Sequence, residues 1–460
     1  MNAQWLNPRG ITERIVAHGT LVLQTPTHLG NGDADGPLDM PLLLDPLEGR
    51  ALLTGTSIAG AMRSYLRTQD ARKADLLFGR QENSDGNSNS YQSPLIVDDA
   101  LGERPKVELR DGVALDPRRR TVEADKKFDI ELLEAGTEFP LHFELLVLKE
   151  YADELRKAFA LALHGLETGA VRLGKRKRRG FGRCTVREWT VHRYQVDTPQ
   201  GMIAWLESKP PCEVKGPIAS ILGLAPQPGT EPGICSLHGT FRLDGSLMIR
   251  SGFAKTDDAD FVHLTSNRDG RNLPVLSGTS LAGALRARAL VIANTLGKDG
   301  KQVTDNLFGS RRNNETEHEK LTASRFWTEE AVIKNGLNLV CSRVKIDRFT
   351  GGSYPGALFT EEPVFGKLKD MTFVEISVKL ESPSDSEVGL LLLLLKDLWT
   401  GDLPLGGEIG VGRGRLRGEK AILSYDEKSW TFFQNGDVLQ VEGDTAMLES
   451  YVKAFAEGQI

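Results

Sequence analysis

The sequence has few cysteines and lacks the motifs of the common metal-dependent and nucleotide-dependent enzymes. Its four cysteines, Cys184, Cys212, Cys235 and Cys341, are scattered and form no CxxC pair. Neither a zinc site nor a disulfide framework is therefore supported, and a reducing cytoplasm is the expected location. There is also no HExxH motif, no Walker loop and no dinucleotide fingerprint, which disfavours zinc proteases and enzymes that use ATP or NAD.

Long hydrophobic runs and an excess of positive charge are absent as well. The longest apolar run, residues 388–395, is far too short to span a membrane. The N-terminal residues contain no basic region followed by an apolar stretch, so no secretory signal is expected. The net charge of −6 over 460 residues gives no global argument for nucleic-acid binding, so any such argument must rest on local charge.

What the chain does contain is an internal repeat. Residues 53–63 read LTGTSIAGAMR and residues 276–286 read LSGTSLAGALR, with eight of eleven positions identical. Each of these two segments is preceded by an HGT triplet that starts a strand-like stretch. Each is also followed by a helix-like stretch that ends in an LFG triplet. Further helices are expected at about 152–167 and 386–399, and a glycine-rich string closes each copy. The repeat predicts two copies of one domain fused in tandem.

The order of the expected elements indicates the fold class. Each copy reads strand, helix, long loops, strands, helix and glycine-rich loop. This order predicts an α+β protein whose two tandem domains have a ferredoxin-like (RRM-type) core enlarged by loop insertions. A high density of prolines places a linker at 196–234, so the expected domains are residues 1–195 and 235–460.

The glycine-rich strings are candidates for binding a polyanion. The first, at 169–184, carries seven cations within twelve residues, and its glycines allow a ligand to approach the backbone closely. The second, at 401–416, is milder, and we align Gly182-Arg183 with Gly412-Arg413. A basic loop in both copies favours RNA binding over two solvated loops. The residues assigned to this contact are Lys175, Arg176, Lys177, Arg178, Arg179, Arg183, Arg413 and Arg415, with Phe181 as a ring for base stacking.

The repeated glycine turns are candidates for binding phosphate. The hydroxyls of the GTS triplets are placed to cap a helix, whose free amides can hold a phosphate. The alternative is an ordinary helix cap in which Gly60 makes a close helix–sheet contact. The residues that the functional interpretation assigns to RNA binding are Gly55, Thr56, Ser57 and Arg63 in the first copy and Gly278, Thr279, Ser280 and Arg286 in the second.

Loop aspartates precede both glycine turns. An isolated loop carboxylate is usually a solvated turn residue, but beside an RNA path it can hold a metal ion or influence a 2′-hydroxyl. Alignment on Gly49 and Gly270 superimposes Asp39 on Asp260. The full set of candidates is Asp33, Asp35, Asp39, Asp45, Asp257, Asp258, Asp260 and Asp269.

Together these motifs resemble the RAMP superfamily. The resemblance rests on LDMPLLLDPLEGRALLTGTSIAGAMR, LPVLSGTSLAGALR, IDRFTGG and the terminal GFGR and GVGRGR loops. It covers nearly the whole chain outside the expected linker. The pattern is most similar to backbone subunits of type III CRISPR effector complexes, and the tandem fusion is most similar to the type III-D arrangement.

The resemblance implies a function and a set of partners. Such a subunit coats the CRISPR guide RNA beside other effector subunits, and a complementary single-stranded target RNA pairs with the guide. In catalytic members a loop aspartate cleaves the target with a divalent metal, here expected to be Mg²⁺. That aspartate lies two residues before a proline and six before an Asp-Pro pair. Asp39 matches this pattern, whereas Asp260 is carried over by spacing alone, and both are the tentative metal ligands.

The resemblance also implies a contact for His28, and it leaves two alternatives open. His28 matches a histidine that relatives have at the same strand end, where it would contact guide or target. Many members have lysine where this chain has Ala59 and Ala282, so part of the guide binding must come from other groups. One alternative is a scaffold with inert aspartates. The other is a guide-processing ribonuclease, for which only His28 is placed to act as the general base.

Overall fold

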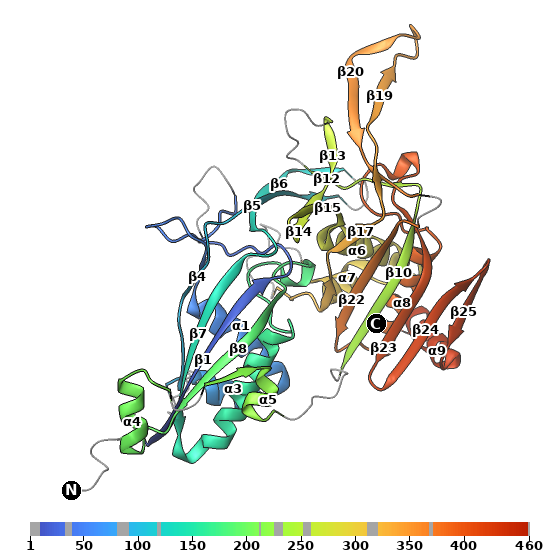
Figure 1. Cartoon of the computed structure of the whole chain (residues 1–460). Helices are drawn as coiled ribbons and strands as arrows, with labels where there is room; N and C mark the ends of the chain where they lie inside the picture. Colours follow the sequence, from blue (N-terminus) through green and yellow to red (C-terminus); the bar gives the residue numbers. More distant parts are fainter. Residues whose placement is uncertain are drawn as a thin grey trace. The chain divides into compact units, whose positions relative to one another are not determined.

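The computed structural model describes residues 10–32, 39–80, 92–116, 121–210, 213–224, 233–251, 259–310, 321–367 and 371–458. The chain divides into two compact units (Figure 1). The first holds residues 1–108, 130–177 and 181–227, and the second holds residues 109–129, 178–180 and 228–460. Two short segments of the first copy therefore belong to the second unit.

The first unit has a ferredoxin-like core. Its elements follow the succession strand, helix, strand, strand, helix, strand, which defines that fold. The sheet order is β3-β7-β1-β8-β9, and every pair is antiparallel. The elements are β1 (Ile11–Leu23), α1 (Gly55–Gln69), β3 (Leu95–Val97), β7 (Glu138–Leu148), α3 (Ala152–Glu167), β8 (Cys184–Tyr194) and β9 (Glu213–Gly216). A second short helix, α2 (Ala71–Phe78), follows α1.

The second unit repeats this plan and extends it. Strands β16 and β17 both pair with β22, and the sheet continues as β22-β10-β23-β24-β25. Helix α9 (Thr445–Glu457) packs on α8. The remaining elements are β10 (Ile234–Asp244), α6 (Gly278–Thr295), α7 (Gly300–Phe308), β16 (Phe326–Thr328), β17 (Ala331–Lys334), β22 (Phe373–Glu381), α8 (Asp385–Trp399), β23 (Arg415–Tyr425), β24 (Lys428–Asn435) and β25 (Val438–Glu442). The predicted fold class is confirmed, and the helices expected at 152–167 and 386–399 are α3 and α8.

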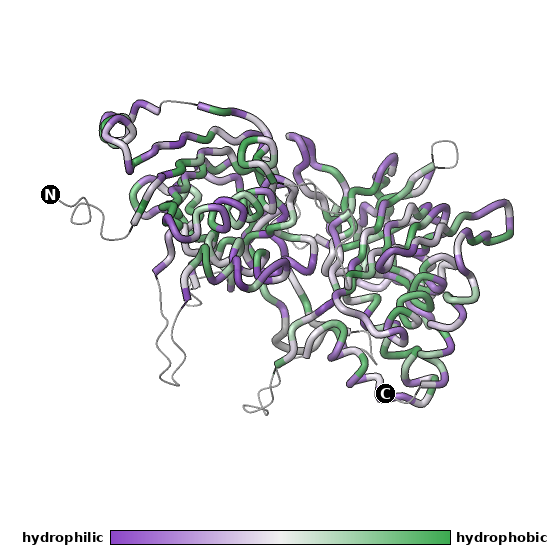
Figure 2. The backbone as a smooth tube through the Cα atoms, turned by 90° about the horizontal axis from the view of Figure 1, so that it is seen from below, coloured by the Kyte–Doolittle hydropathy of each residue, from purple (hydrophilic) through white to green (hydrophobic). Residues whose placement is uncertain are grey.

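The core of each unit follows from alternation along the strands. On β1, Ile15, Ala17 and Leu21 are fully buried, while His18 between them is exposed. Figure 2 shows hydrophobic residues interleaved with hydrophilic ones along the chain of both units. Period-two alternation gives each strand one face for the helices and one for solvent.

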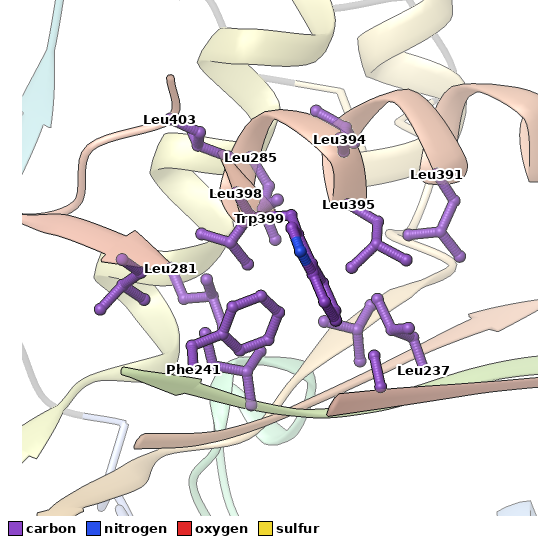
Figure 3. Close-up of a cluster of buried hydrophobic side chains, with 14 of the residues drawn as sticks. Leu237, Phe241, Leu281, Leu285, Leu391, Leu394, Leu395, Leu398, Trp399 and Leu403 are labelled. Carbon is purple, nitrogen blue, oxygen red and sulfur yellow. The ribbon is translucent and has the colours of Figure 1, made fainter. Parts of the chain in front are cut away.

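Helix α8 supplies one of the two tryptophans of the second core. Trp399 stands between the helix and the sheet beside Phe241 of β10 (Figure 3), with ring centroids 6.0 Å apart in an edge-to-face arrangement. Its Nε1 donates to Gln434 Oε1 at 2.8 Å, so the indole is buried with its polar atom satisfied. A Cβ at Gly418 would lie 1.9 Å from the Trp399 ring, so glycine at that position makes room for it.

The longest apolar run of the sequence also lies on α8. Val388, Leu391 and Leu394 of this run are buried against the sheet and α9. Among the described residues, no helix combines the length and the apolar character needed to cross a membrane.

A β-hairpin is inserted at the same point of each copy. The first is β5 (Val107–Leu115) with β6 (Val122–Leu133), and the second is β19 (Cys341–Ile346) with β20 (Ser353–Glu362). The amide of Asp116 donates to the carbonyl of Thr121 at 2.9 Å, and the amide of Asp347 donates to that of Gly352 at 2.8 Å, at matching points of the two turns. The second hairpin projects from the body of its unit (Figure 1). Residues 117–120, which include Arg118–Arg120, lie outside the described residues.

The segment predicted as a linker is more ordered than its prolines indicate. Within residues 196–234 the structure contains α4 (Pro199–Leu206), β9 and α5 (Ile218–Leu222). Pro199 occupies the first turn of α4, where a missing amide hydrogen costs nothing, and Pro217 caps α5. Strand β9 pairs with β8, and Ile218 is fully buried, so residues up to 227 are part of the first unit.

Candidate nucleic-acid interface

Both repeated glycine turns start a helix, but the caps differ from those predicted. The caps of α1 and α6 are Thr54 and Ser277, whose side-chain oxygens accept hydrogen bonds from the amides of Ser57 and Ser280 at 3.3 and 3.2 Å. The prediction placed the cap two or three residues too late, because the hydroxyl before each glycine takes that role. The hydroxyls of the GTS triplets therefore lie in the first helical turn, at Thr56, Ser57, Thr279 and Ser280.

The glycines of the turns have two different roles. A Cβ at Gly55 would lie 2.2 Å from the carbonyl oxygen of Val97, so this position requires glycine for close packing. In contrast, a Cβ at Gly60 or Gly283 would meet no atom within 4 Å, and both residues are exposed. The proposed helix–sheet contact of Gly60 is therefore wrong. These two glycines leave helix backbone open to a ligand instead.

The arginines that follow, Arg63 and Arg286, tie two helices together. Arg63 donates to the carbonyl oxygen of Gly79 at 3.0 Å and pairs with Asp75 of α2. Arg286 makes the same contacts, with the carbonyl oxygen of Gly309 at 2.8 Å and with Asp305 of α7. This shared role explains why the arginines and the LFG triplets are repeated, and the predicted contacts with RNA stay a prediction.

A carboxylate follows the second core strand of each copy, and sequence analysis missed both. In the first copy, Asp99 Oδ1 accepts a hydrogen bond from the Gly55 amide at 2.6 Å, so it occupies the helix start. In the second copy the equivalent residue is Glu330, which is fully buried between Arg110 and Arg268. Although burial acts to raise it, these guanidinium groups hold the pKa of Glu330 below its ordinary value. The signal was present as VDDA at 97–100 and TEEA at 328–331.

The first glycine-rich loop is built by close backbone contacts. The amide of Leu173 donates to the carbonyl of Gly182 at 2.9 Å, and the amide of Lys175 donates to that of His28 at 3.1 Å. A Cβ at Gly174 would lie 2.3 Å from the His28 carbonyl oxygen, and Gly174 has φ +78°. The glycines therefore serve the loop's own packing.

The cations of this loop are unequally accessible. Lys175 and Arg183 are exposed, whereas residues 176–179 are half-buried. Within the second unit, Arg178 pairs with Glu381 at 3.3 Å and lies over the Trp327 ring, 5.1 Å from its centroid. Burial lowers the pKa of Arg176, as expected for a cation withdrawn from water. Lys175 and Arg183 are therefore the best candidates for contact with a phosphate backbone.

Phe181 is not available for base stacking. Its side chain is 2% exposed and packs with Ile130, Leu132 and Met40 in a small apolar cluster. The predicted stacking role is wrong in this structure, because the backbone turn at Gly180 and Gly182 directs the ring inward at the base of hairpin β5–β6.

The second glycine-rich loop has the same architecture, with a different alignment from the one predicted. A Cβ at Gly182 would lie 1.9 Å from the carbonyl oxygen of Leu173, and a Cβ at Gly414 would lie 1.9 Å from that of Leu405. Gly414 is therefore the equivalent of Gly182. Arg415, which is exposed, therefore corresponds to Arg183. Arg413 corresponds to Phe181 and is 5% exposed, with its guanidinium on Glu361 and Glu408. Arg413 thus has an internal role in place of the predicted RNA contact.

His28 is buried and supports the first loop. Only 1% of its surface is exposed, and Nδ1 lies 2.9 Å from the carbonyl oxygen of Glu131. Burial lowers the pKa of His28 despite this hydrogen bond, and the charges of Lys175 and Arg176 act in the same direction. In the second copy, the amide of Gly407 donates to the carbonyl oxygen of Met248 at 2.7 Å, as the amide of Lys175 does to that of His28 in the first. Met248 is therefore the structural equivalent of His28, although sequence spacing alone would align His28 with Arg250. A buried imidazole is poorly placed for the predicted RNA contact.

Asp39 and Asp260 lie at equivalent points of the two copies. Asp39 directly precedes Met40, which forms a parallel bridge with Ile130. Asp260 directly precedes Phe261, which pairs in parallel with Glu361. Both aspartates are exposed. The carboxylate of Asp260 accepts hydrogen bonds from the amide and hydroxyl of Thr360, which hold its pKa below the ordinary value. The other candidates Asp33, Asp35, Asp257 and Asp258 lie outside the described residues.

A divalent metal at these positions would need ligands from RNA. Across the described ranges, no three His, Cys, Asp or Glu side chains gather closely enough to hold a metal ion. Mg²⁺ commonly binds through one or two carboxylates together with substrate phosphates and waters. Asp39 and Asp260 are both exposed carboxylates, the ligand type of that donor set, and Oδ2 of Asp260 also accepts two hydrogen bonds from Thr360.

Comparison with known proteins adds a family match. A model of the RAMP superfamily matches residues 20–185 and 240–417, one region in each copy. No curated protein in the comparison matches the chain.

Proposed function

Because the chain belongs to the RAMP superfamily, we propose that it is a guide-RNA-binding backbone subunit of a type III CRISPR effector complex, in a tandem arrangement of the type III-D kind. Its partners are the CRISPR guide RNA, a complementary single-stranded target RNA and other effector subunits. The scattered cysteines fit a cytoplasmic location.

One observation carries the RNA-binding part of this proposal. Residues 178–180 of the basic loop lie within the second unit, against the start of α6. There a Cβ at Gly278 would lie 2.3 Å from the carbonyl oxygen of Arg179, and Thr328 donates to that of Arg178 at 3.4 Å. Two elements that sequence analysis assigned to RNA independently are therefore neighbours. A cationic loop beside a helix N-terminus is a favourable path for a phosphate backbone.

We propose further that Asp39 cleaves the target RNA with Mg²⁺. Asp39 is exposed on its loop and matches the family's spacing to proline and Asp-Pro, which supports this role. A bound Mg²⁺ would supply a Lewis acid at the scissile phosphate. Asp260 is the weaker candidate, because the proline and the Asp-Pro pair that follow Asp39 have no counterpart after Asp260.

The test uses the assembled complex with guide, target RNA and Mg²⁺. Asp39→Ala is expected to abolish one target cut and leave guide binding unchanged, and chelation of the metal is expected to abolish cleavage. Glu48→Ala is the matched control, because Glu48 is an exposed carboxylate of the same loop. Survival of every cut in the Asp39→Ala, Asp260→Ala double variant would refute the catalytic assignment.

The two alternatives make different predictions in the same assay. A non-catalytic scaffold binds guide and target without metal-dependent cleavage by any variant. A guide-processing ribonuclease requires His28 as the general base, and the burial of that imidazole disfavours it.

A further inference from the structure

The loop that carries Asp39 is fastened to strand β6 at two points, and both involve Glu131. The carboxylate oxygen Oε2 of Glu131 accepts a hydrogen bond from the amide of Leu42 at 3.0 Å. The backbone amide of Glu131 donates to the carbonyl oxygen of Met40 at 3.1 Å. Glu131 therefore holds the first and the third residue after Asp39, and it does so from a strand, which fixes a site more precisely than a loop does.

Backbone bridges restrict the same loop on both of its sides. Met40 forms a parallel bridge with Ile130, and Leu42 forms an antiparallel bridge with Gly30. The side chain of Met40 also packs on Ile130 in the apolar cluster at the base of hairpin β5–β6. The loop thus has a defined backbone path, and the carboxylate of Glu131 adds a side-chain hydrogen bond to it.

Glu131 also connects this loop to the first glycine-rich loop through His28. Nδ1 of His28 lies 2.9 Å from the carbonyl oxygen of Glu131, and because a carbonyl oxygen only accepts, Nδ1 is the donor. The carbonyl oxygen of His28 in turn accepts a hydrogen bond from the amide of Lys175 at 3.1 Å. A Cβ at Gly30 would lie 2.5 Å from Nε2 of His28, so glycine at that position makes room for the imidazole. Glu131 therefore joins the loop of the proposed catalytic aspartate to the loop of an exposed cation.

We propose that Glu131 is a positioning residue for target cleavage, which holds the Asp39 loop in a fixed place relative to RNA on the first glycine-rich loop. This inference rests on the proposed function of Asp39. A catalytic group that is displaced by about 1 Å can slow a reaction by about 100-fold. A loop without the hydrogen bond from Leu42 to Glu131 should therefore cleave more slowly, although it still carries Asp39.

The hydrogen bond uses Glu131 as an acceptor and does not require its charge. The amide of Leu42 is a neutral donor, so a neutral side-chain oxygen at the same distance can accept from it. Glu131→Gln keeps such an oxygen, Glu131→Asp withdraws the carboxylate by one methylene group, and Glu131→Ala removes the acceptor. A metal ligand or a general base would show the opposite order for Gln and Asp, because both roles depend on the carboxylate.

The test uses the assembled complex with guide, Mg²⁺ and saturating target RNA, and it follows the cut that Asp39→Ala abolishes. Glu131→Ala and Glu131→Asp are expected to lower kcat for that cut by about 10- to 100-fold, with KM for the target and the affinity for the guide unchanged. Glu131→Gln is expected to cleave at close to the wild-type rate. Glu362→Ala is the matched control, because Glu362 holds the equivalent position of the second copy and should leave this cut unchanged.

The outcomes separate this role from the assignment of Asp39. Persistence of every cut in Asp39→Ala would overturn that assignment, and the role of Glu131 with it. Loss of a cut in Asp39→Ala, together with a wild-type kcat in Glu131→Ala and Glu131→Asp, would overturn only the positioning role. That role is also overturned if Glu131→Gln is as slow as Glu131→Ala, or if Glu131→Asp loses guide binding or slows every cut equally.

Discussion

Asp260 accepts two hydrogen bonds from Thr360, one from the backbone amide at 2.7 Å and one from the hydroxyl at 3.0 Å. In return, the Asp260 amide donates to the Thr360 hydroxyl at 3.0 Å. These contacts fasten the residue before β13 (Phe261–His263) to β20, so the carboxylate has a structural use that is independent of any reaction.

Removal of the Asp260 carboxylate should loosen β20. Asp260→Ala and Thr360→Val are each expected to speed hydrogen exchange of the amides around residue 360. The hydrogen bonds lower the pKa of Asp260, so this stabilisation is present above the ordinary aspartate value of about 3.9 and is lost as pH falls through the lowered pKa. Unchanged exchange in both variants would contradict the structural role.

The open helix glycines should separate stability from binding. Gly60→Ala and Gly283→Ala are expected to stabilise the fold by about 0.5–1 kcal/mol each, because both sites are helical and have free space for a methyl group. They are also expected to weaken guide-RNA binding, since the methyl would stand where RNA approaches the backbone. Denaturation and binding titrations measure the two effects. A stabilised variant with unchanged affinity would show that RNA does not approach there.

The repeated arginines should be required for stability. Arg286→Ala is expected to cost about 1.5–3 kcal/mol in the free energy of unfolding, because it leaves the Gly309 carbonyl and Asp305 without their charged donor. Arg63→Ala should act in the same direction in the first unit. Arg271→Ala removes an exposed arginine of the hairpin formed by β14 (Thr265–Arg268) and β15 (Arg271–Leu276) and is the matched control. Equal stability of Arg286→Ala and the control would contradict this role.

The exposed loop cations should dominate the salt dependence of RNA binding. Lys175→Ala with Arg183→Ala is expected to reduce the slope of log affinity against log salt by about 1.4, since each contact with a single strand contributes about 0.7. Arg178→Ala should change the slope less, because that guanidinium pairs with Glu381. An unchanged slope in the double variant would mean that the RNA runs elsewhere.

The sequence predicted the fold well because the repeat records features shared by both copies. The helices at 152–167 and 386–399 and the succession of strands and helices along each copy follow from residues that alternate or recur at fixed spacing. The same repetition misled the assignment of roles to Arg63 and Arg286. A recurring arginine beside a glycine turn fits phosphate binding and helix pairing equally well, and only the positions of Gly79 and Gly309 separate the two.

The sequence could not decide how the glycine-rich loops of the two copies align, because the alternatives differ by only two positions. The GxG repeats of 401–416 allow two alignments, and only the close approach of Gly414 to Leu405 selects between them. Burial was also beyond reach for Phe181 and Arg413, which look accessible within a glycine-rich string. Their environment is set by hairpins that join the core far away in the sequence.

Residues 109–129 and 178–180 are encoded in the first copy but belong to the compact body of the second. Arg110 thus meets Glu330 across 220 positions of sequence, with Nη2 3.1 Å from Oε1. Substitution of Arg110 leaves Arg268 as the cation paired with Glu330, and substitution of Glu330 removes the carboxylate that both arginines contact, so the two positions are coupled. The tandem copies are therefore not free to diverge as separate genes would be, and a lineage that split them would have to replace this contact first.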